Sequence, residues 1–405
     1  MMNKRSLLKG VGDALAGTAL AKFSLPFDAH AEDVTSLPFA NGERPLARYP
    51  GKRPLIRSTS RPPQLETPFA VFNEGAITPN DAFYVRYHLA DIPLSIDPDA
   101  FRIEVKGKVD RPLSLSLTDL KSGFEPLEIV AVNECSGNSR GFFEPRVGGG
   151  QLGNGAMGNA RWRGVPLKSV LDKAGIQAGS RQVTFNGLDE PVLPETPDFI
   201  KALDLEHARD GEVMIAYGMN GEDLPWLNGY PVRLVVPGYY GTYWVKHLNE
   251  ITVIDSIYDG FWMKSVYRIP DNRCACTEPG QAPAATVPIN RLNVRSFITN
   301  LANGAKVKAR IGTLVKGIAF DGGYGITDVL LSSDLGQTWT AAKLGPDLGR
   351  YSFREWRTAL RLPPGKHELK VRALNRIGQS QPMAPLWNPS GYMRNVVETV
   401  RVQAV

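Results

Sequence analysis

The stretch that decides the fold reads Val130-Ala131-Val132-Asn133-Glu134-Cys135-Ser136-Gly137-Asn138-Ser139-Arg140-Gly141. The apolar run of residues 127–132 predicts a buried strand, which small and turn-forming residues end abruptly. Cys135 stands at the break, and a loop on a rigid strand is a common place to present a reactive thiol. Packing as a small buried hydrophobe is the commoner use of a lone cysteine, so both interpretations stay open here.

The composition is that of a soluble globular protein with two domains. A chain of 405 residues exceeds the size at which one hydrophobic core keeps growing. Its 40 glycines and 31 prolines favour many short strands and turns over long helices. The formal charge of +6 is modest for this length, and no run of lysine and arginine resembles a nucleic-acid footprint. We therefore exclude nucleic acid as a partner.

Residues 1–31 have the pattern of an export signal. The basic start, Asn3-Lys4-Arg5-Ser6-Leu7-Leu8-Lys9, resembles a twin-arginine signal with lysine replacing the first arginine. A mildly apolar stretch follows at residues 10–21, and Ala29-His30-Ala31 supplies the small-x-small pattern of a cleavage site. The apolar stretch is too short to cross a bilayer. The sequence predicts a periplasmic protein without a membrane span.

The three cysteines do not form a disulfide framework. Cys274 and Cys276 are separated by one residue, which is too tight for an ordinary disulfide loop. An incidental surface pair is the favoured interpretation, with a strained bridge or a metal-sensitive spot as alternatives. No Cys-x-x-Cys-His motif occurs, which excludes a covalently bound c-type haem in these residues.

Residues 32–75 are rich in proline and arginine and show no periodicity, so we expect an extended arm. A strap over an acidic face of the same protein would explain its charge. A docking surface for an acidic partner is the alternative. Residues 82–89 then have strand character, and alternation places Arg86 and His88 on one face. Such a pair suits anion recognition or, equally, a solvated edge strand.

The middle of the chain mixes strands with one helix. Pro166 suits a first helical turn, residues 167–174 carry one apolar face, and Gly175 ends the pattern. The glycine-rich residues 147–158 lack a phosphate-loop or dinucleotide pattern, so we expect a flexible or close-approach loop there. Strands are expected at residues 101–109, 182–188, 212–217 and 230–238.

The composition changes to alanine and proline near residues 277–288, which predicts a linker. Beyond it, short strands separated by turn signals predict a β-sandwich. These strands are expected at residues 305–315, 326–332, 338–343, 351–359 and 369–374.

Nine residues gather as candidates for a site: Arg86, His88, Cys135, Arg140, Asp189, Arg233, Lys246, Tyr267 and Arg357. Only one of them is acidic, so the set describes a cationic pocket around one thiolate. A soft thiolate favours a soft or high-valent metal, and the cations suit an anionic cofactor and substrate.

In these features the chain resembles the sulfite oxidase family of molybdopterin enzymes along nearly its whole mature length. The motifs that carry the resemblance occur in the family's order, and several together are far more specific than any one alone. They are Phe83-Tyr84-Val85-Arg86-Tyr87-His88, Asn133-Glu134-Cys135-Ser136-Gly137-Asn138-Ser139-Arg140, Trp162-Arg163-Gly164-Val165-Pro166-Leu167, Tyr230-Pro231-Val232-Arg233-Leu234-Val235-Val236-Pro237-Gly238, Val245-Lys246 and Ala384-Pro385-Leu386-Trp387-Asn388.

The resemblance implies an α+β architecture of four parts. An export signal (1–31) and an arm (32–75) would precede a mixed α/β molybdopterin-binding domain (76–280). An all-β immunoglobulin-like sandwich of the dimerisation type (281–405) would follow. Two departures from the family pattern stand out: Asn228 replaces a histidine common in relatives, and Glu134 replaces a glycine or alanine.

The resemblance also implies roles for the candidates. Cys135 would bind molybdenum, and four cations would hold the pterin phosphate and dithiolene, with His88 and Asp189 close by. Those four are Arg86, Arg140, Arg233 and Lys246. Tyr267 and Arg357 would line the sulfite pocket together with Arg86.

The implied activity is oxidation of sulfite to sulfate, with electrons passed to a c-type cytochrome subunit or acceptor. A sulfane dehydrogenase or a sulfoxide reductase on the same cofactor domain is the nearest alternative. A secreted β-rich binding protein in which Cys135 is merely buried is the alternative from a different class.

Overall fold

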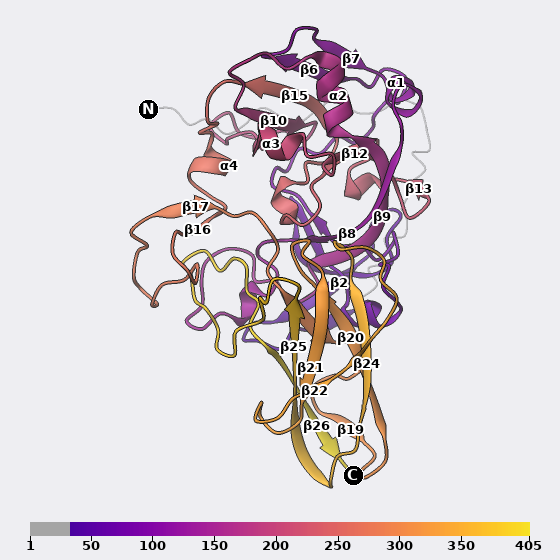
Figure 1. Cartoon of the computed structure of the whole chain (residues 1–405), viewed down its shortest axis with the longest axis vertical. Coiled ribbons are helices and arrows are strands. Elements are labelled where there is room, and N and C mark those ends of the chain that lie inside the picture. Colours follow the sequence, from indigo (N-terminus) through magenta and orange to yellow (C-terminus); the bar gives the residue numbers. More distant parts are fainter. Residues whose placement is uncertain (1–32) are drawn as a thin grey trace, which may run out of the picture. The chain divides into compact units, whose positions relative to one another are not determined.

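The computed structural model describes residues 33–405, so the expected export signal lies outside the described residues. Strands dominate this part of the chain, and its α-helices are short (Figure 1). They are α1 Leu117–Ser122, α2 Leu167–Ala174, α3 Leu205–Ala208 and α4 Phe261–Lys264. The helix predicted at residues 167–174 is confirmed. Its apolar face is buried, and Gly175 adopts φ +74° directly after it.

The arm is extended, as expected, but it has regular structure that the sequence pattern does not predict, because four strands form within it. They pair with one another and with β5 in the order β1-β2-β3-β4-β5. Their bounds are β1 Val34–Ser36, β2 Glu43–Ala47, β3 Leu55–Ser60, β4 Pro63–Glu66 and β5 Val85–Arg86. Arg53 forms an ion pair with Glu74 at 3.1 Å, within the arm, and another with Asp81 at 2.9 Å, beyond the arm.

Two further sheets build the part of the chain that holds Cys135. One has the order β11-β10-β15-β6-β7, and the other has the order β13-β12-β9-β8 with β14 beside β12. The first contains β6 Ile103–Gly107, β7 Leu113–Leu115, β10 Gln182–Gly187, β11 Lys201–Asp204 and β15 Leu248–Ile254. The second contains β8 Leu127–Glu134, β9 Met157–Pro166, β12 Met214–Met219, β13 Glu222–Asp223 and β14 Arg233–Val235. A small pair, β16 Arg268–Pro270 and β17 Thr286–Pro288, follows.

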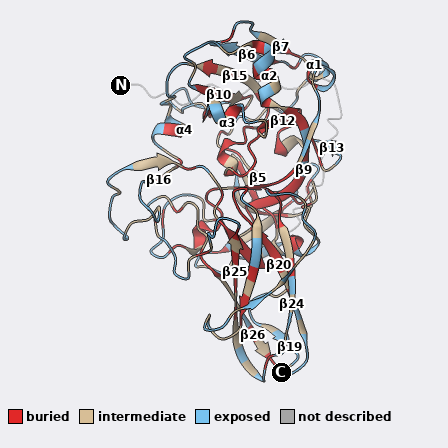
Figure 2. Cartoon of the chain, in the orientation of Figure 1, coloured by how far each residue is buried: buried red, intermediate tan, exposed pale blue. Residues whose placement is uncertain are grey.

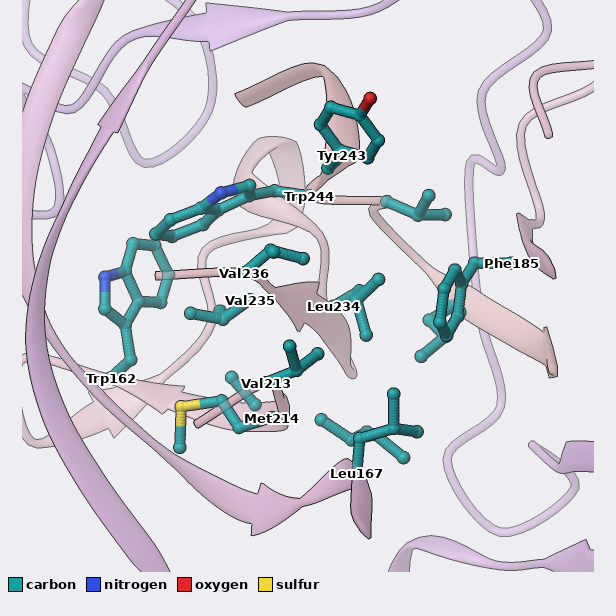
Figure 3. Close-up of a cluster of buried hydrophobic side chains, with 14 of the residues drawn as sticks. Trp162, Leu167, Phe185, Val213, Met214, Leu234, Val235, Val236, Tyr243 and Trp244 are labelled. Atoms are coloured by element: carbon teal, nitrogen blue, oxygen red, sulfur yellow. The ribbon is translucent and has the colours of Figure 1, made fainter. Parts of the chain in front are cut away.

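A continuous apolar core supports these sheets (Figures 2 and 3). Trp162 of β9 and Trp244 pack edge to face with ring centroids 5.5 Å apart. The strand β12 is buried along its whole length, because β9 and β14 pair with its two sides. Burial of this kind fixes the strand β8, and with it the loop that begins at Cys135.

The predicted C-terminal β-domain is formed by two sheets that share one apolar core. Their orders are β18-β20-β24-β23 and β19-β26-β25-β21-β22. The bounds are β18 Arg295–Ile298, β19 Ala305–Val307, β20 Thr313–Phe320, β21 Ile326–Ser332, β22 Thr340–Ala341, β23 Lys343–Leu344, β24 Arg354–Leu360, β25 Gly365–Asn375 and β26 Glu398–Ala404. The strands β18 and β26 were not predicted, and the strand expected at residues 305–315 is divided between β19 and β20, which belong to different sheets.

Segments of this β-domain reach the Cys135 region through backbone hydrogen bonds. The amide of Val132 donates to the carbonyl of Tyr351 at 2.9 Å, and the amide of Met393 donates to the carbonyl of Ser136 at 2.9 Å. Within residues 33–405, no helix has the length and apolar character that a bilayer crossing requires.

Candidate functional site

Cys135 lies on a tight loop directly after β8. Its amide donates to the carbonyl of Ala156 at 2.9 Å, and its carbonyl accepts from the amide of Asn138 at 2.8 Å. The thiol is free and half-buried. It lines two cavities, which share Arg86, Ser136 and Tyr267 as well. Cys135 is therefore placed to bind a group that enters from either cavity.

The inner cavity combines aromatic walls with three cations. Asp189 is the single acidic residue among those that line it. Its polar lining comprises Arg86, His88, Asn133, Cys135, Ser136, Asp189, Asn228, Arg233, Thr242, Lys246 and Tyr267. A cavity with this excess of positive charge is suited to an anionic ligand.

Arg233 is the most buried of these cations, with a side chain only 4% exposed. It donates to the carbonyls of Asn228 at 3.0 Å and Trp244 at 3.1 Å. Its guanidinium also faces the ring of Trp162, 5.1 Å from the centroid. Burial lowers its pKa from 12.5 to about 10. No carboxylate pairs with it among the hydrogen bonds of the described residues, so an anionic ligand would supply the missing charge.

Lys246 lines the inner cavity together with one buried carboxyl group, that of Asp189. Burial lowers the pKa of Lys246 to about 7, with further lowering by Arg233, while Asp189 acts in the opposite direction. Burial likewise raises the pKa of Asp189 to about 6, and Lys246 opposes that rise. The ammonium lies 3.8 Å from the ring centroid of Tyr87. A bound anion would favour the charged form of Lys246.

Three polar atoms around the inner cavity are buried without a hydrogen-bond partner. They are the hydroxyls of Ser136 and Thr242 and the Nε of Arg233. Buried polar groups nearly always have partners, so these atoms indicate a ligand with several acceptors. The residues present therefore fit a phosphate-bearing cofactor.

The outer cavity meets the inner one at Cys135 and carries two arginines. Arg86 lines both cavities, whereas Arg140 lines only the outer one. Arg140 is 9% exposed, and its Nε donates to the carbonyl of Ser390 at 3.1 Å. Gly149 has φ +96°, and a Cβ there would lie 2.9 Å from the Arg140 guanidinium. The predicted close-approach role of the glycine-rich loop is thus confirmed at this position.

Tyr267 and His88 form a hydrogen-bonded pair beside Cys135. The His88 ring stacks on Phe199 with centroids 3.6 Å apart. Burial and the neighbouring cations lower the pKa of His88 well below 6.5, so its imidazole is neutral, and with its hydrogen on Nε2 it can donate to the phenol oxygen. Tyr267 has φ +57°, a strained left-handed conformation for a residue with a side chain. The surrounding structure thus holds the phenol in place.

No carboxylate is among the residues that line the outer cavity. Tyr392, from the C-terminal part of the chain, lines it and was not predicted. Its ring stacks on Tyr267 at a centroid distance of 5.3 Å, and the Arg140 guanidinium lies 4.9 Å from its centroid. The arrangement can hold a small anion beside the Cys135 thiol.

The placement of Arg357 in this pocket was wrong. It lies on β24, where it pairs with Lys316 of β20 on one side and Lys343 of β23 on the other. It lines a different cavity, together with those two lysines. The register of the sheet, which the sequence pattern could not give, determines this position. The other eight candidates line the inner or the outer cavity.

The structure explains Asn228, one of the two departures from the family pattern, and corrects the prediction made for Cys274 and Cys276. The side chain of Asn228 accepts from Lys52 at 2.5 Å and donates to the carbonyl of Tyr84 at 3.0 Å. Asn228 thereby ties the N-terminal arm to the wall of the inner cavity.

Cys274 and Cys276 are not an incidental pair, because a disulfide joins them.

Two family models match this chain. The oxidoreductase molybdopterin binding domain matches residues 89–262, and the Mo-co oxidoreductase dimerisation domain matches residues 286–405. Arg86, His88 and Tyr267 lie outside both matched ranges.

Individual relatives agree with these matches. The chain is 34% identical to human mitochondrial sulfite oxidase over 377 residues, which cover 88% of this chain and 67% of the relative. It is 33% identical to chicken sulfite oxidase over 370 residues, covering 87% and 79%, respectively. A solved structure, the sulfane dehydrogenase SoxCD from Paracoccus pantotrophus, shares the fold with a TM-score of 0.73. The identity is 24%, and the alignment covers 96% of this chain and 93% of that one.

Proposed function

Since the chain belongs to the sulfite oxidase family of molybdopterin enzymes, we propose that it is a sulfite dehydrogenase. It would oxidise sulfite to sulfate and pass the electrons to a c-type cytochrome. The observation that carries this proposal is the outer cavity, in which Arg86, Arg140 and Tyr267 converge beside the Cys135 thiol without any lining carboxylate. Such a lining is matched to a small oxyanion rather than to a cation or an apolar ligand.

The cofactor is a molybdenum–molybdopterin group, and the inner cavity supplies the residues that would hold it. Arg233 and Lys246 provide buried positive charge for its phosphate. The unpaired hydroxyls of Ser136 and Thr242 would gain partners. Cys135 would be the protein ligand to the metal, since a thiolate is the soft donor that such a centre accepts. When bound, this group supplies two-electron redox chemistry and oxygen transfer.

The arginines of the outer cavity would bind sulfite. Sulfite carries up to two negative charges, and charge-assisted hydrogen bonds from Arg86 and Arg140 compensate for the water that it loses. Cys135 itself lines this cavity, so the bound anion would lie next to the metal ligand. Overall, sulfite and water give sulfate, two protons and two electrons.

Tyr267 would orient the reacting oxygen. Burial raises the pKa of its phenol well above 10, so the hydroxyl keeps its proton at neutral pH. In the tautomer with its hydrogen on Nε2, the neutral imidazole of His88 donates to the phenol oxygen, which leaves the phenol hydrogen free for the bound anion. A fixed donor beside the anion pocket can stabilise negative charge on an oxygen as the reaction proceeds.

We propose a separate c-type cytochrome as the electron acceptor and the periplasm as the compartment. The 405 residues carry no Cys-x-x-Cys-His motif, which supports an external carrier. The export pattern of residues 1–31 supports the compartment. Fractionation of cells that produce the full chain, with and without residues 1–31, tests the location. Full-length protein that stays entirely in the cytoplasm would contradict it.

The decisive experiment is sulfite-dependent electron transfer by the purified, molybdenum-loaded protein. We expect sulfite to reduce both ferricyanide and a mitochondrial-type cytochrome c. Thiosulfate, as a carrier of sulfane sulfur, and dimethyl sulfoxide with a reduced dye test the two alternative activities. Turnover of either in preference to sulfite would overturn the substrate assignment. Reduction of ferricyanide but not of any c-type cytochrome would overturn the acceptor alone.

A further inference from the structure

Glu134, the residue before the metal ligand, is paired with an arginine that comes from the C-terminal β-domain. Arg295 opens the strand β18, and its Nη1 donates to Glu134 Oε1 at 2.6 Å. Both side chains are only 1% exposed. Burying an ion pair so completely is costly unless its geometry and its further hydrogen bonds are good. A buried ion pair beside Cys135, the proposed metal ligand, is therefore expected to have a specific role.

The same guanidinium also holds the far side of the Cys135 loop. Arg295 Nη2 donates to the hydroxyl of Ser139 at 2.9 Å. Ser139 has φ +69°, an uncommon left-handed conformation at the point where the loop turns back. One arginine thus contacts residues on both sides of Cys135, one before it and one four positions after it.

The loop is braced from within around the same carboxylate. Asn138 Nδ2 donates to Glu134 Oε1 at 2.9 Å, and Asn138 Oδ1 accepts from the amide of Ala156 at 3.0 Å. The amide of Cys135 donates to the carbonyl of that same Ala156. A displacement of Glu134 would therefore be transmitted to the backbone that carries the thiol.

The guanidinium of Arg295 is also held by residues of the β-domain. Its Nη2 lies 3.2 Å from Glu398 Oε1, which also accepts from Arg394 at 2.8 Å. The guanidinium is 4.5 Å from the ring centroid of Phe297. Groups of the β-domain thus hold the same guanidinium that contacts the loop, so the brace is preorganised.

We propose that Arg295 is a positioning residue for the metal-binding thiolate. Acting through Glu134 and Ser139, it fixes the direction in which Cys135 presents its sulfur. The β-domain is then part of the metal site, although none of its strands carries a metal ligand. Outer contacts that orient a ligand commonly alter metal binding or activity by about 10–100-fold when removed.

The inference rests on Cys135 being the metal ligand, but its first test needs neither metal nor sulfite. Cys274 and Cys276 are joined, which leaves Cys135 as the single free thiol among the three cysteines. Its alkylation by iodoacetamide in the cofactor-free protein reports how firmly the loop is held. We expect Arg295→Met to speed this reaction by about tenfold or more.

The matched control is Arg394→Met. It removes another largely buried arginine from the Glu398 carboxylate, but Arg394 donates to Glu398 and packs over the ring of Phe142, and it makes no hydrogen bond to residues 134–139. We expect alkylation within about twofold of the unsubstituted protein, because the Cys135 loop keeps its brace. Equal rates for Arg295→Met and Arg394→Met would overturn the proposal.

Arg295→Lys keeps the experiment decisive if Arg295→Met does not fold. A lysine can pair with Glu134 but cannot bridge Glu134, Ser139 and Glu398 with a planar fork. We expect an intermediate alkylation rate, and in the loaded protein an altered Mo(V) electron paramagnetic resonance spectrum. A lysine variant identical to the unsubstituted protein in both measurements would also overturn the proposal. A different result is that the unsubstituted, molybdenum-loaded protein fails to oxidise sulfite while the alkylation rates of the variants still differ as expected. That result would contradict only the proposed substrate.

Discussion

The imidazole of His88 and the phenol of Tyr267 are hydrogen-bonded although 179 residues separate them in the sequence. Both line the inner cavity, and Tyr267 lines the outer cavity as well. The imidazole is neutral and burial keeps the phenol protonated, so an imidazole with its hydrogen on Nε2 donates to the phenol oxygen and leaves the phenol hydrogen free. This pair places a defined hydroxyl hydrogen at the junction of the two cavities.

Replacing Tyr267 with phenylalanine should slow sulfite oxidation without preventing cofactor binding. The variant loses the oriented donor but keeps the ring that stacks on Tyr392. We expect kcat to fall by about 10²-fold, as for loss of one preorganised donor. Steady-state kinetics with ferricyanide and the molybdenum content of the protein measure the two effects. Tyr324→Phe, on an exposed tyrosine of the β-domain, is the control. An unchanged kcat in Tyr267→Phe would refute the role.

Replacing Arg86 with methionine should weaken sulfite binding. One charge-assisted hydrogen bond contributes roughly 1.5–3 kcal/mol, so KM should rise at least about tenfold. Arg357→Met is the matched control, because Arg357 lines a different cavity. We expect its KM to equal that of the unsubstituted protein. A large rise in KM for Arg357→Met would indicate that Arg357 lies in the sulfite pocket after all, contrary to the structure.

Serine at position 135 should abolish sulfite oxidation while the fold persists. The hydroxyl is a harder and less acidic donor than the thiol, so it is a poor replacement as a ligand. The half-buried side chain differs little in size, so unfolding by urea should change by less than about 1 kcal/mol. Turnover near that of the unsubstituted protein would contradict the ligand assignment.

Lys201 gives a pH-dependent prediction. The side chain is fully buried, its Nζ donates to the carbonyl of Trp262 at 2.6 Å, and burial lowers its pKa from 10.5 to about 7. The unfolded chain therefore binds more protons than the folded one between about pH 7 and 10.5. Stability should rise with pH across that window by about 1.4 kcal/mol per unit from this group.

Lys201→Met should remove the contribution of Lys201 to the rise of the free energy of unfolding with pH. Urea unfolding of the cofactor-free protein at pH 7.5 and pH 9.5 measures it, with Lys343→Met as an exposed control that keeps the slope. An identical pH dependence in Lys201→Met and the unsubstituted protein would disprove the assignment.

The sequence predicted the elements whose signals are local. The helix α2 has its apolar spacing and its terminal Gly175 within ten residues, and the apolar run before Cys135 became β8. The resemblance to a family brought distant residues such as Arg86 and Tyr267 into one site. The arm was predicted but its strands were not, because they lack regular alternation and their pairing depends on register between strands.

Register and burial explain the remaining differences. Nothing within β24 reveals that Arg357 lies opposite Lys316, because cross-strand register is a property of two strands. Lys201 was overlooked because lysine is ordinarily exposed. Glu134 could not be explained from the sequence, since its partner Arg295 lies 161 residues away.

The Arg295–Glu134 contact has a consequence for how such proteins can be recombined. A chimera that exchanges residues 286–405 between relatives also exchanges Arg295, Ser390 and Tyr392, which contact the Cys135 region. A recipient with glycine or alanine before its cysteine would bury an arginine without its carboxylate. Compatible parents must therefore match at position 134 as well as at the junction. Residues 286–405 can therefore be exchanged only together with a compatible residue at position 134.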